Sequence, residues 1–170
     1  MSVTLIVHIV AMRPLFRMKL SKGSWALFGK GNNIIPSELV LAYKRTDFKV
    51  LEPRPFTLQV GSYSPELASL YSQMKTSSAG YLTAWNPYSV VSSHEDNQRS
   101  QEALLRKLSL EGFTTLSAFG VDPSGDWPGE TSVLAPGLDL ERTKSLGNEF
   151  AQNAVLWIGD DAVPQLILLR

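Results

Sequence analysis

The chain has 170 residues, of which 44% are hydrophobic and 19% are charged, and its 16 basic side chains balance its 16 acidic ones. This length and apolar content suffice for one domain with a sizeable core, whereas the neutral charge balance argues against binding nucleic acid through bulk positive charge. The lack of cysteine excludes disulfides, thiolate catalysis and cysteine zinc sites, and it fits a cytoplasmic location.

The first 36 residues differ in character from the rest. Thr4 to Met12 is apolar, but about nine residues are far fewer than the roughly 20 that a membrane-spanning helix needs, and no basic residue precedes the run as in a signal peptide. We predict that residues 1–36 are a non-core extension, either disordered or upstream of the true start at Met12 or Met18. A membrane-surface anchor and an added strand are the alternatives. Residues 37–170 would then form a single domain.

The first part of this domain is predicted as helix, strand, strand, helix. Ser37 is a plausible N-cap, and the apolar run 39–43 favours a short helix over a strand. Residues 47–51 and 56–60 are predicted as a hairpin, because the second run alternates with period two and a proline-rich turn separates them. A second helix is expected to begin at Ser64-Pro65, with apolar residues at helical spacing at Leu67, Leu70, Tyr71 and Met74.

A strand beginning near Tyr81 is predicted to stop at Asn86-Pro87, since proline cannot donate to a sheet. Ser93 resembles the N-cap of a helix that runs to about Glu111, and Gly112 suits its left-handed end. The strand end carrying Trp85, Asn86 and Tyr88 would therefore face a helix start.

The remaining elements complete a recognisable order. Strands are predicted over 113–119, 131–138, 154–158 and 164–169, with a helix from the Asp139 N-cap to Phe150 in which Gly147 requires a close backbone contact. From Tyr81 the order is βαββαβ plus a terminal strand, which is the split βαβ order of ferredoxin-like folds. We therefore predict an α+β fold, with a mostly antiparallel sheet, helices on one face and an N-terminal α-β-β-α extension.

Side-chain amides are concentrated near the predicted strand ends and helix starts. Amides recognise ligands by paired donor and acceptor bonds, and buried ones must find partners, so this set predicts either a polar pocket or caps for backbone groups. Two tryptophans offer stacking surfaces beside it; the alternative is that each fills a gap under its loop, and for Trp85, inside a predicted strand, core packing is the favoured reading. The candidate ligand-binding residues are Trp85, Asn86, Asn97, Gln101, Trp127, Glu130, Gln152 and Asn153.

Three carboxylates recur every four residues in the loop 120–130. Asp122, Asp126 and Glu130 could together bind a divalent cation such as Mg²⁺ or Ca²⁺, although aspartate before proline or glycine is also ordinary turn chemistry. No other cofactor is indicated. The single histidine of the folded region, His94, has no partnered serine or cysteine with which to form a catalytic triad.

Several of these stretches resemble one family. Residues 81–87, the helix with Asn97, the loop 122–130 and the segments 146–147 and 150–154 are similar, in the same order, to the bacterial domain-of-unknown-function family 3293. The likeness covers about residues 39–169. It implies a small, single-domain, cytoplasmic bacterial protein, and it implies no activity or catalytic residue.

These patterns leave three functions open. The first is a non-catalytic module that binds a small molecule or a protein through the amide and tryptophan rim. The second is a hydrolase-like or metal-dependent enzyme that uses Asp122, Asp126 or Glu130 as acid, base or ligand. The third, nucleic-acid binding on the sheet face, rests on fold analogy and requires exposed aromatic and basic residues there.

Overall fold

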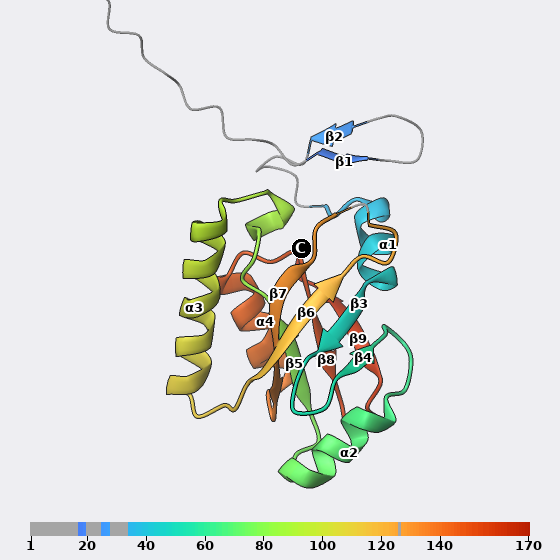
Figure 1. Cartoon of the computed structure of the whole chain (residues 1–170), viewed down its shortest axis with the longest axis vertical. Coiled ribbons are helices and arrows are strands. Elements are labelled where there is room, and N and C mark those ends of the chain that lie inside the picture. Colours follow the sequence, from blue (N-terminus) through green and yellow to red (C-terminus); the bar gives the residue numbers. More distant parts are fainter. Residues whose placement is uncertain (1–16, 20–24, 28–33, 126) are drawn as a thin grey trace, which may run out of the picture.

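A computed structural model describes residues 17–19, 25–27, 34–125 and 127–170 (Figure 1). The elements, in chain order, are β1 (Arg17–Lys19), β2 (Trp25–Leu27), α1 (Ser37–Arg45), β3 (Asp47–Val50), β4 (Phe56–Leu58), α2 (Pro65–Met74), β5 (Ala79–Leu82), η1 (Pro87–Ser89), α3 (His94–Leu110), β6 (Leu116–Val121), β7 (Glu130–Pro136), α4 (Leu140–Glu149), β8 (Ala154–Ile158) and β9 (Pro164–Leu168). The apolar run at residues 4–12 lies outside the described residues. None of the described helices is long and apolar enough to cross a membrane.

The fold is α+β and its main sheet is antiparallel throughout. Seven strands are ordered β4-β3-β6-β7-β5-β8-β9, and each neighbouring pair is antiparallel. β1 and β2 form a separate antiparallel pair. The strand β5 lies between β7 and β8, so the segment that begins near Tyr81 occupies a central position in the sheet.

The two faces of the sheet bury different clusters, because successive side chains of a strand point to opposite faces. In β7, Val133 and Ala135 pack with residues of α3 and α4, whereas Leu134 between them packs with residues of α2. The prediction that all helices share one face is therefore wrong. It holds for α3 and α4, while α1 and α2 lie at opposite ends of the curled sheet (Figure 1).

The sheet curls so far that its two edges meet at one end. The backbone N–H of Gly61, just after β4, donates to the carbonyl of Pro164 in β9 at 2.8 Å. Ser64 N–H donates to the carbonyl of Ala162 at 3.0 Å. These bonds join opposite edges of the sheet next to α2, so the inner face encloses a core there and leaves its α1 end available for a pocket.

The sequence signals for helix starts predicted three of the N-cap residues correctly. Ser64, Ser93 and Asp139 accept hydrogen bonds from the backbone N–H groups of Leu67, Asp96 and Arg142, as N-caps do. Ser37 is not an N-cap: it is the first residue of α1, and the carbonyl of Pro36 accepts the bonds from residues 39 and 40.

Gly147 packs as the sequence predicts. A Cβ atom there would lie 2.5 Å from Val155 Cγ1 and 2.6 Å from Leu169 Cδ1. The helix α4 approaches β8 and the chain beyond β9 so closely that only glycine fits without displacement.

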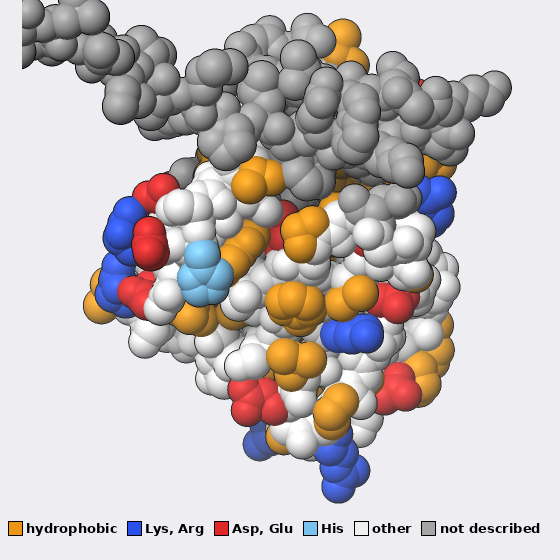
Figure 2. All heavy atoms as spheres, turned by 45° about the horizontal axis from the view of Figure 1, so that its top comes forward, with side chains coloured by type: hydrophobic (Ala, Val, Ile, Leu, Met, Phe, Trp, Pro, Cys, Tyr) orange, Lys and Arg blue, Asp and Glu red, His pale blue; other side chains and the backbone are white. Residues whose placement is uncertain are grey.

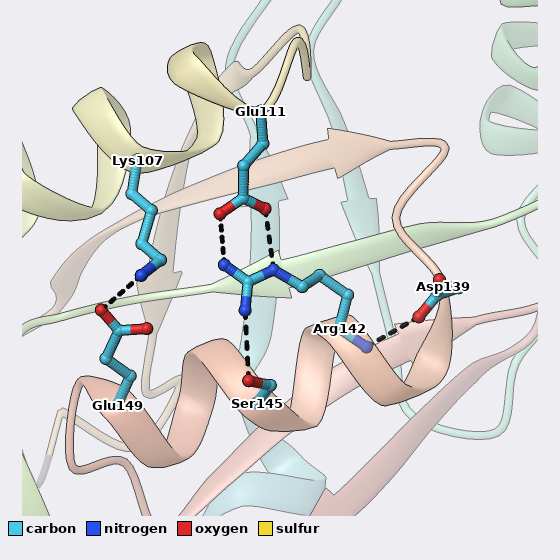
Figure 3. A network of polar contacts seen from close by, with 6 residues as sticks. All are labelled: Lys107, Glu111, Asp139, Arg142, Ser145 and Glu149. Atoms are coloured by element: carbon cyan, nitrogen blue, oxygen red, sulfur yellow. Dashed lines mark hydrogen bonds and ion pairs between the residues drawn. The ribbon is translucent and has the colours of Figure 1, made fainter.

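Ion pairs join α3 to α4 on the outer side of the molecule (Figure 3). The Arg142 guanidinium donates to both carboxylate oxygens of Glu111, with Nε at 2.7 Å from Oε2, and also to Ser145 Oγ. Lys107 Nζ lies 2.7 Å from Glu149 Oε1. The last turn of α3 and its C-cap residue are thus tied to α4.

Candidate functional site

A cavity of about 100 Å³ opens inside the curled sheet at its α1 end. Its walls come from α1, from six strands and from the loops around residues 86–91, 120–130 and 152. The lining residues are Leu39, Tyr43, Thr46, Phe48, Tyr81, Thr83, Asn86, Ser89, Val91, Gly120, Trp127, Pro128, Glu130, Ser132, Gln152, Ala154, Val155, Leu156 and Leu166. Most of them are apolar or aromatic, so the few polar groups are prominent.

Asn86 organises one side of this pocket. Its backbone N–H donates to Asn97 Oδ1 at 2.8 Å, and its own Oδ1 accepts from Ser92 N at 3.1 Å and from Asn97 Nδ2 at 2.9 Å. These contacts fix the amide so that Asn86 Nδ2 donates to Glu130 Oε1 at 2.9 Å. The hydrogen bonds therefore connect the chain after β5, the start of α3 and the first residue of β7.

Gln152 lines the pocket as well, and Asn153 lies next to it in the chain without lining the pocket. Gln152 Nε2 donates to the carbonyls of Trp85 at 3.2 Å and Phe150 at 3.1 Å. Asn153 Nδ2 donates to the Tyr43 hydroxyl at 3.2 Å and to Ser89 Oγ at 3.0 Å. The segment after α4 is thereby bonded to α1 and to the chain that follows β5.

The positively charged side chain of Arg170 lies beside Asn153 and Tyr88. Its Nε donates to Asn153 Oδ1 at 2.8 Å, and its guanidinium carbon lies 4.3 Å from the centre of the Tyr88 ring. Arg170 is not among the lining residues. Its charge is already matched by an amide oxygen and an aromatic face.

Left-handed backbone is concentrated at the same rim. The φ angles of Asn86, Tyr88, Ser89 and Ala151 are 47°, 55°, 56° and 54°. Residues other than glycine rarely adopt such angles, which cost about 1 kcal/mol or more each. Tyr88 N–H donates to the carbonyl of Ala151 at 2.7 Å, so two of these residues hold each other. Strain of this kind is typical of functional loops.

Glu130 is the one acidic side chain among the described lining residues, and it is half-buried. Burial raises the pKa of Glu130 to about 7, and the Asn86 hydrogen bond offsets part of that increase. No ion pair joins Glu130 to a described basic residue. The carboxyl group can therefore change its protonation state near neutral pH.

Two tyrosines face this carboxyl group. Burial raises the pKa of Tyr43 and of Tyr81, and the charge of Glu130 adds to both increases. Both hydroxyls are therefore neutral at physiological pH, so they serve as hydrogen-bonding groups.

Asn97 and Gln101 lie behind the pocket wall and do not line it. Gln101 Oε1 accepts from the backbone N–H of Ala84 at 2.8 Å. Gln101 Nε2 is buried, and within the described part of the chain it has no hydrogen-bond partner. These two amides support the turn after β5, which is the capping role that the sequence left open.

The two tryptophans differ in position. Trp127 lines the pocket. Trp85 lies after β5, outside the strand, where its ring meets that of His94 edge to face with centroids 5.6 Å apart. It contributes to the site through its carbonyl, which Gln152 bonds.

The loop carboxylates do not act as a set in the described residues. Asp122 is buried, and its Oδ1 accepts from the backbone N–H and the hydroxyl of Ser124 at 3.0 and 2.7 Å, which is turn chemistry. Asp126 lies outside the described residues. Across the ranges that the structure describes, no group of three or more His, Cys, Asp or Glu side chains could hold a metal ion.

Some lining residues escaped sequence analysis. Tyr43 and Phe48 look like ordinary apolar positions of a helix and a strand, and Tyr81 like a core residue. The one signal that pointed toward Tyr43 was the apolar run 39–43. Its placement over the end of the sheet depends on contacts far along the chain.

Comparison with known proteins identified a family for part of the chain. Residues 82–155 match the family model described as "Protein of unknown function (DUF3293)", which confirms over those residues the resemblance drawn from the motifs. Comparisons with curated proteins and with solved structures found no match.

Proposed function

Residues 82–155 belong to the family described as "Protein of unknown function (DUF3293)", and since that description names no activity, we propose a function from the pocket itself. The chain is a binding module for a small molecule, which enters the pocket between α1 and the Trp127 loop and makes its main polar contact with Glu130. The bacterial source and cytoplasmic location indicated by the motifs and the composition are part of this proposal.

One observation carries the proposal: the pocket and the strained backbone occur at the same rim. Three segments far apart in the chain meet there, and Asn86 and Gln152 line the pocket from two of them. Concave, mostly apolar pockets with a few convergent polar groups are the usual form of small-molecule sites. Backbone strain of this kind clusters at active sites and ligand clamps.

The shape of the sheet favours a small molecule over a nucleic acid. Its inner face carries buried residues such as Val50, Leu134 and Leu156, so this face is not an open platform for stacked bases. Figure 2 shows hydrophobic side chains along the middle of the described surface at this end, with Lys and Arg scattered around them. A surface that binds the phosphates of a nucleic acid would instead show Lys and Arg side chains clustered together.

A pocket-filling variant tests the proposal. Gly120 lines the pocket, and a Cβ atom there would meet Thr46 Cγ2 at 3.8 Å and Trp127 Cη2 at 3.9 Å, both ordinary contacts. We expect Gly120→Val to fold and to lose the thermal shifts that a library of small molecules produces in the wild-type chain. Ser117→Val, at an exposed position of the same strand, is the matched control and keeps those shifts.

Fluorescence locates the binding event. Trp127 lines the pocket, while Trp85 and Trp157 do not. A compound that binds in the pocket is therefore expected to change the emission of the wild-type chain, and Trp127→Phe removes most of that change. Shifts that survive in Gly120→Val, or emission changes that survive in Trp127→Phe, would place binding elsewhere and contradict the proposal.

A second candidate is acid–base catalysis by Glu130. A carboxyl group with a pKa of about 7 can both take up and release a proton near neutral pH, which supports this reading. It differs from the metal-dependent alternative because it needs neither Asp122 nor Asp126. A screen of ester and amide substrates would support it if turnover appears and is lost in Glu130→Gln, whereas binding without turnover leaves the first proposal alone.

The finer fold assignment also stays a proposal. A ferredoxin-like core is supported by the strand order β6-β7-β5-β8 and by the helices α3 and α4 that follow β5 and β7 and pack on one face. A solved structure of the segment that retained this order and packing would establish it.

A further inference from the structure

We propose that the ligand of this pocket is an organic cation, with an aromatic or similarly apolar body and a protonated nitrogen that pairs with the carboxylate of Glu130. This inference rests on the proposed binding function and adds the chemical class of the ligand. It follows from the walls of the pocket, from its charge and from the bonds that Glu130 leaves unmade.

The walls suit a flat or apolar body with positive charge. Tyr43, Phe48, Tyr81 and Trp127 enter from α1, β3, β5 and the loop before β7. The rings of Phe48 and Tyr81 pack edge to face, with centroids 5.2 Å apart and an angle of 80° between their planes. Aromatic rings bury apolar surface and also attract a cation placed over their faces, so this lining favours organic cations over organic anions.

The charged side chains of the described pocket wall are of one sign only. Glu130 is the one acidic group among the described lining residues, and none of those residues is Lys or Arg. An anionic ligand would therefore meet repulsion with no compensating cation in the described wall. A cationic ligand would supply the opposite charge that a desolvated carboxylate otherwise lacks.

Glu130 has hydrogen-bonding capacity to spare. From the described side chains its carboxylate receives one hydrogen bond, from Asn86 Nδ2 to Oε1. Oε2 is left for a donor that enters the pocket. Asn86 cannot rotate away, since Ser92 and Asn97 hold its Oδ1, and therefore the carboxylate is positioned before any ligand arrives.

The other ionisable groups nearby do not replace that cation. Tyr43 on α1 and Tyr81 on β5 face Glu130 and stay neutral, because burial raises the pKa of each. Arg170, beyond β9, bonds Asn153 and lies over Tyr88, and its charge acts on Tyr43. Glu130 is therefore the group whose ionisation sets the affinity for a cation.

Benzylamine and benzyl alcohol make a matched pair of probes. They share a ring and a similar shape, and benzylamine is protonated at both pH 6 and pH 8 while benzyl alcohol is neutral. On the full chain at pH 8, Trp fluorescence titration is expected to show benzylamine binding about tenfold more tightly than benzyl alcohol. Because the ionised fraction of Glu130 falls from about nine-tenths at pH 8 to about one-tenth at pH 6, benzylamine affinity falls about tenfold.

The variant arm uses Glu130→Gln, which keeps the shape and the acceptor oxygen for Asn86 but removes the charge. We expect it to lose both the preference for benzylamine and the pH dependence, so that the two probes bind it with similar affinity at pH 6 and at pH 8. The pH comparison needs only the wild-type chain, so it decides the question even if the variant fails to fold.

The outcomes separate the two proposals. If benzyl alcohol binds at least as tightly as benzylamine and neither responds to pH, the cation proposal is overturned and the pocket remains a binding site. If neither probe binds and no library compound shifts the wild-type chain in a way that Gly120→Val removes, the binding function itself is overturned.

Discussion

The carboxyl group of Glu130 is suited to binding a ligand, but its ionisation lowers the stability of the folded chain. Water solvates an ionised carboxylate better than the pocket does, and one side-chain amide, that of Asn86, donates to the carboxylate here. The raised pKa of Glu130 measures this deficit. A pH-dependent loss of stability follows, and it can be measured without knowing the ligand.

The sign of that dependence is set by which state holds the proton more tightly. The pKa of Glu130 is raised from 4.5 to about 7 on folding, so between these values the folded chain binds the proton and the unfolded chain releases it. Stability contributed by this residue therefore falls as pH rises from 4.5 to about 7. We expect Glu130→Gln to be more stable than the wild type at pH 8 by about 1 to 3 kcal/mol, measured by urea unfolding.

The same comparison at pH 4.5 is the control. There the folded wild type carries a neutral Glu130, so the two proteins should have nearly equal free energies of unfolding. An equal loss of stability in Glu130→Gln at both pH values would show that the residue is well solvated and that its ionisation is unperturbed.

Individual site residues were predicted from sequence unevenly. The amides and Trp127 stood out because polar or aromatic groups collected at strand ends, yet the even spacing of Asp122, Asp126 and Glu130 gave no means of ranking them. What distinguishes Glu130 is that it begins β7 and meets Asn86 across 44 positions of chain. Tyr43 was missed for the same reason, since its partner Asn153 is 110 positions away.

At the scale of elements, the packing of α4 against β8 depends on one absent side chain. Helix propensity alone would make Gly147→Ala stabilising by about 1 kcal/mol. The added Cβ, however, would lie 2.5 Å from Val155 Cγ1. Because overpacking a close contact costs about 1 to 3 kcal/mol, we expect net destabilisation in thermal or urea unfolding.

Asn148→Ala is the matched control one position further along the helix. Asn148 is exposed, and its amide bonds only the backbone of its own helix, so this change should be neutral or slightly stabilising. If Gly147→Ala proved as stable as Asn148→Ala, α4 would have room to move away from β8.

The ion pair between Arg142 and Glu111 contributes less to the free energy of unfolding than the close contact at Gly147. Both side chains are about 30% exposed or slightly less, and partly exposed pairs contribute up to about 1 kcal/mol. We expect Glu111→Gln to lose no more than that in urea unfolding, and to lose less near 1 M salt because of screening. The hydrogen bonds of Arg142 lower the pKa of Glu111, so the stabilisation is present at neutral pH and is lost as pH falls through that lowered pKa.

Glu102→Gln on the same helix provides a comparison. Its partner Arg106 is 3.9 Å away and both side chains are more than half exposed, so the change should have no measurable effect. If the two variants lost equal free energy of unfolding, the two-pronged hydrogen bonding between Arg142 and Glu111 would add no stability beyond that of an exposed ion pair.

Helices were the elements that local sequence predicted best, because their signals are local. The N-caps Ser64, Ser93 and Asp139 each bond a residue three positions ahead. Strand limits shifted more: a strand predicted over 113–119 is β6 at Leu116–Val121. Strand ends are decided by partners elsewhere, here β3 and β7.

For the whole molecule, closure of the sheet is the feature that sequence did not predict. Nothing in the pattern of β4 or β9 indicates that the two edges meet, since the meeting follows from the accumulated twist of seven strands. It explains why α1 and α2 occupy the ends of the sheet. Helices that share one face with α3 and α4 would leave the inner face uncovered.

Hydrogen exchange provides a direct test of that closure. The amides of Gly61 and Ser64 donate across the junction to Pro164 and Ala162, so we expect both to exchange slowly although they lie outside regular strands. The amide of Tyr63, an exposed residue between them, is the control and should exchange quickly. Equal rates at all three positions would mean that the junction opens readily in solution.

The division of the pocket between two parts of the chain has an evolutionary consequence. Asn86 and Glu130 lie within the family segment 82–155, whereas Tyr43 and Phe48 lie outside it. Relatives that share this segment and keep Glu130 would have the charged anchor, and the aromatic wall supplied by α1 and β3 could differ among them. We expect such relatives to keep one kind of polar recognition while diverging in the size and shape of the molecules they accept.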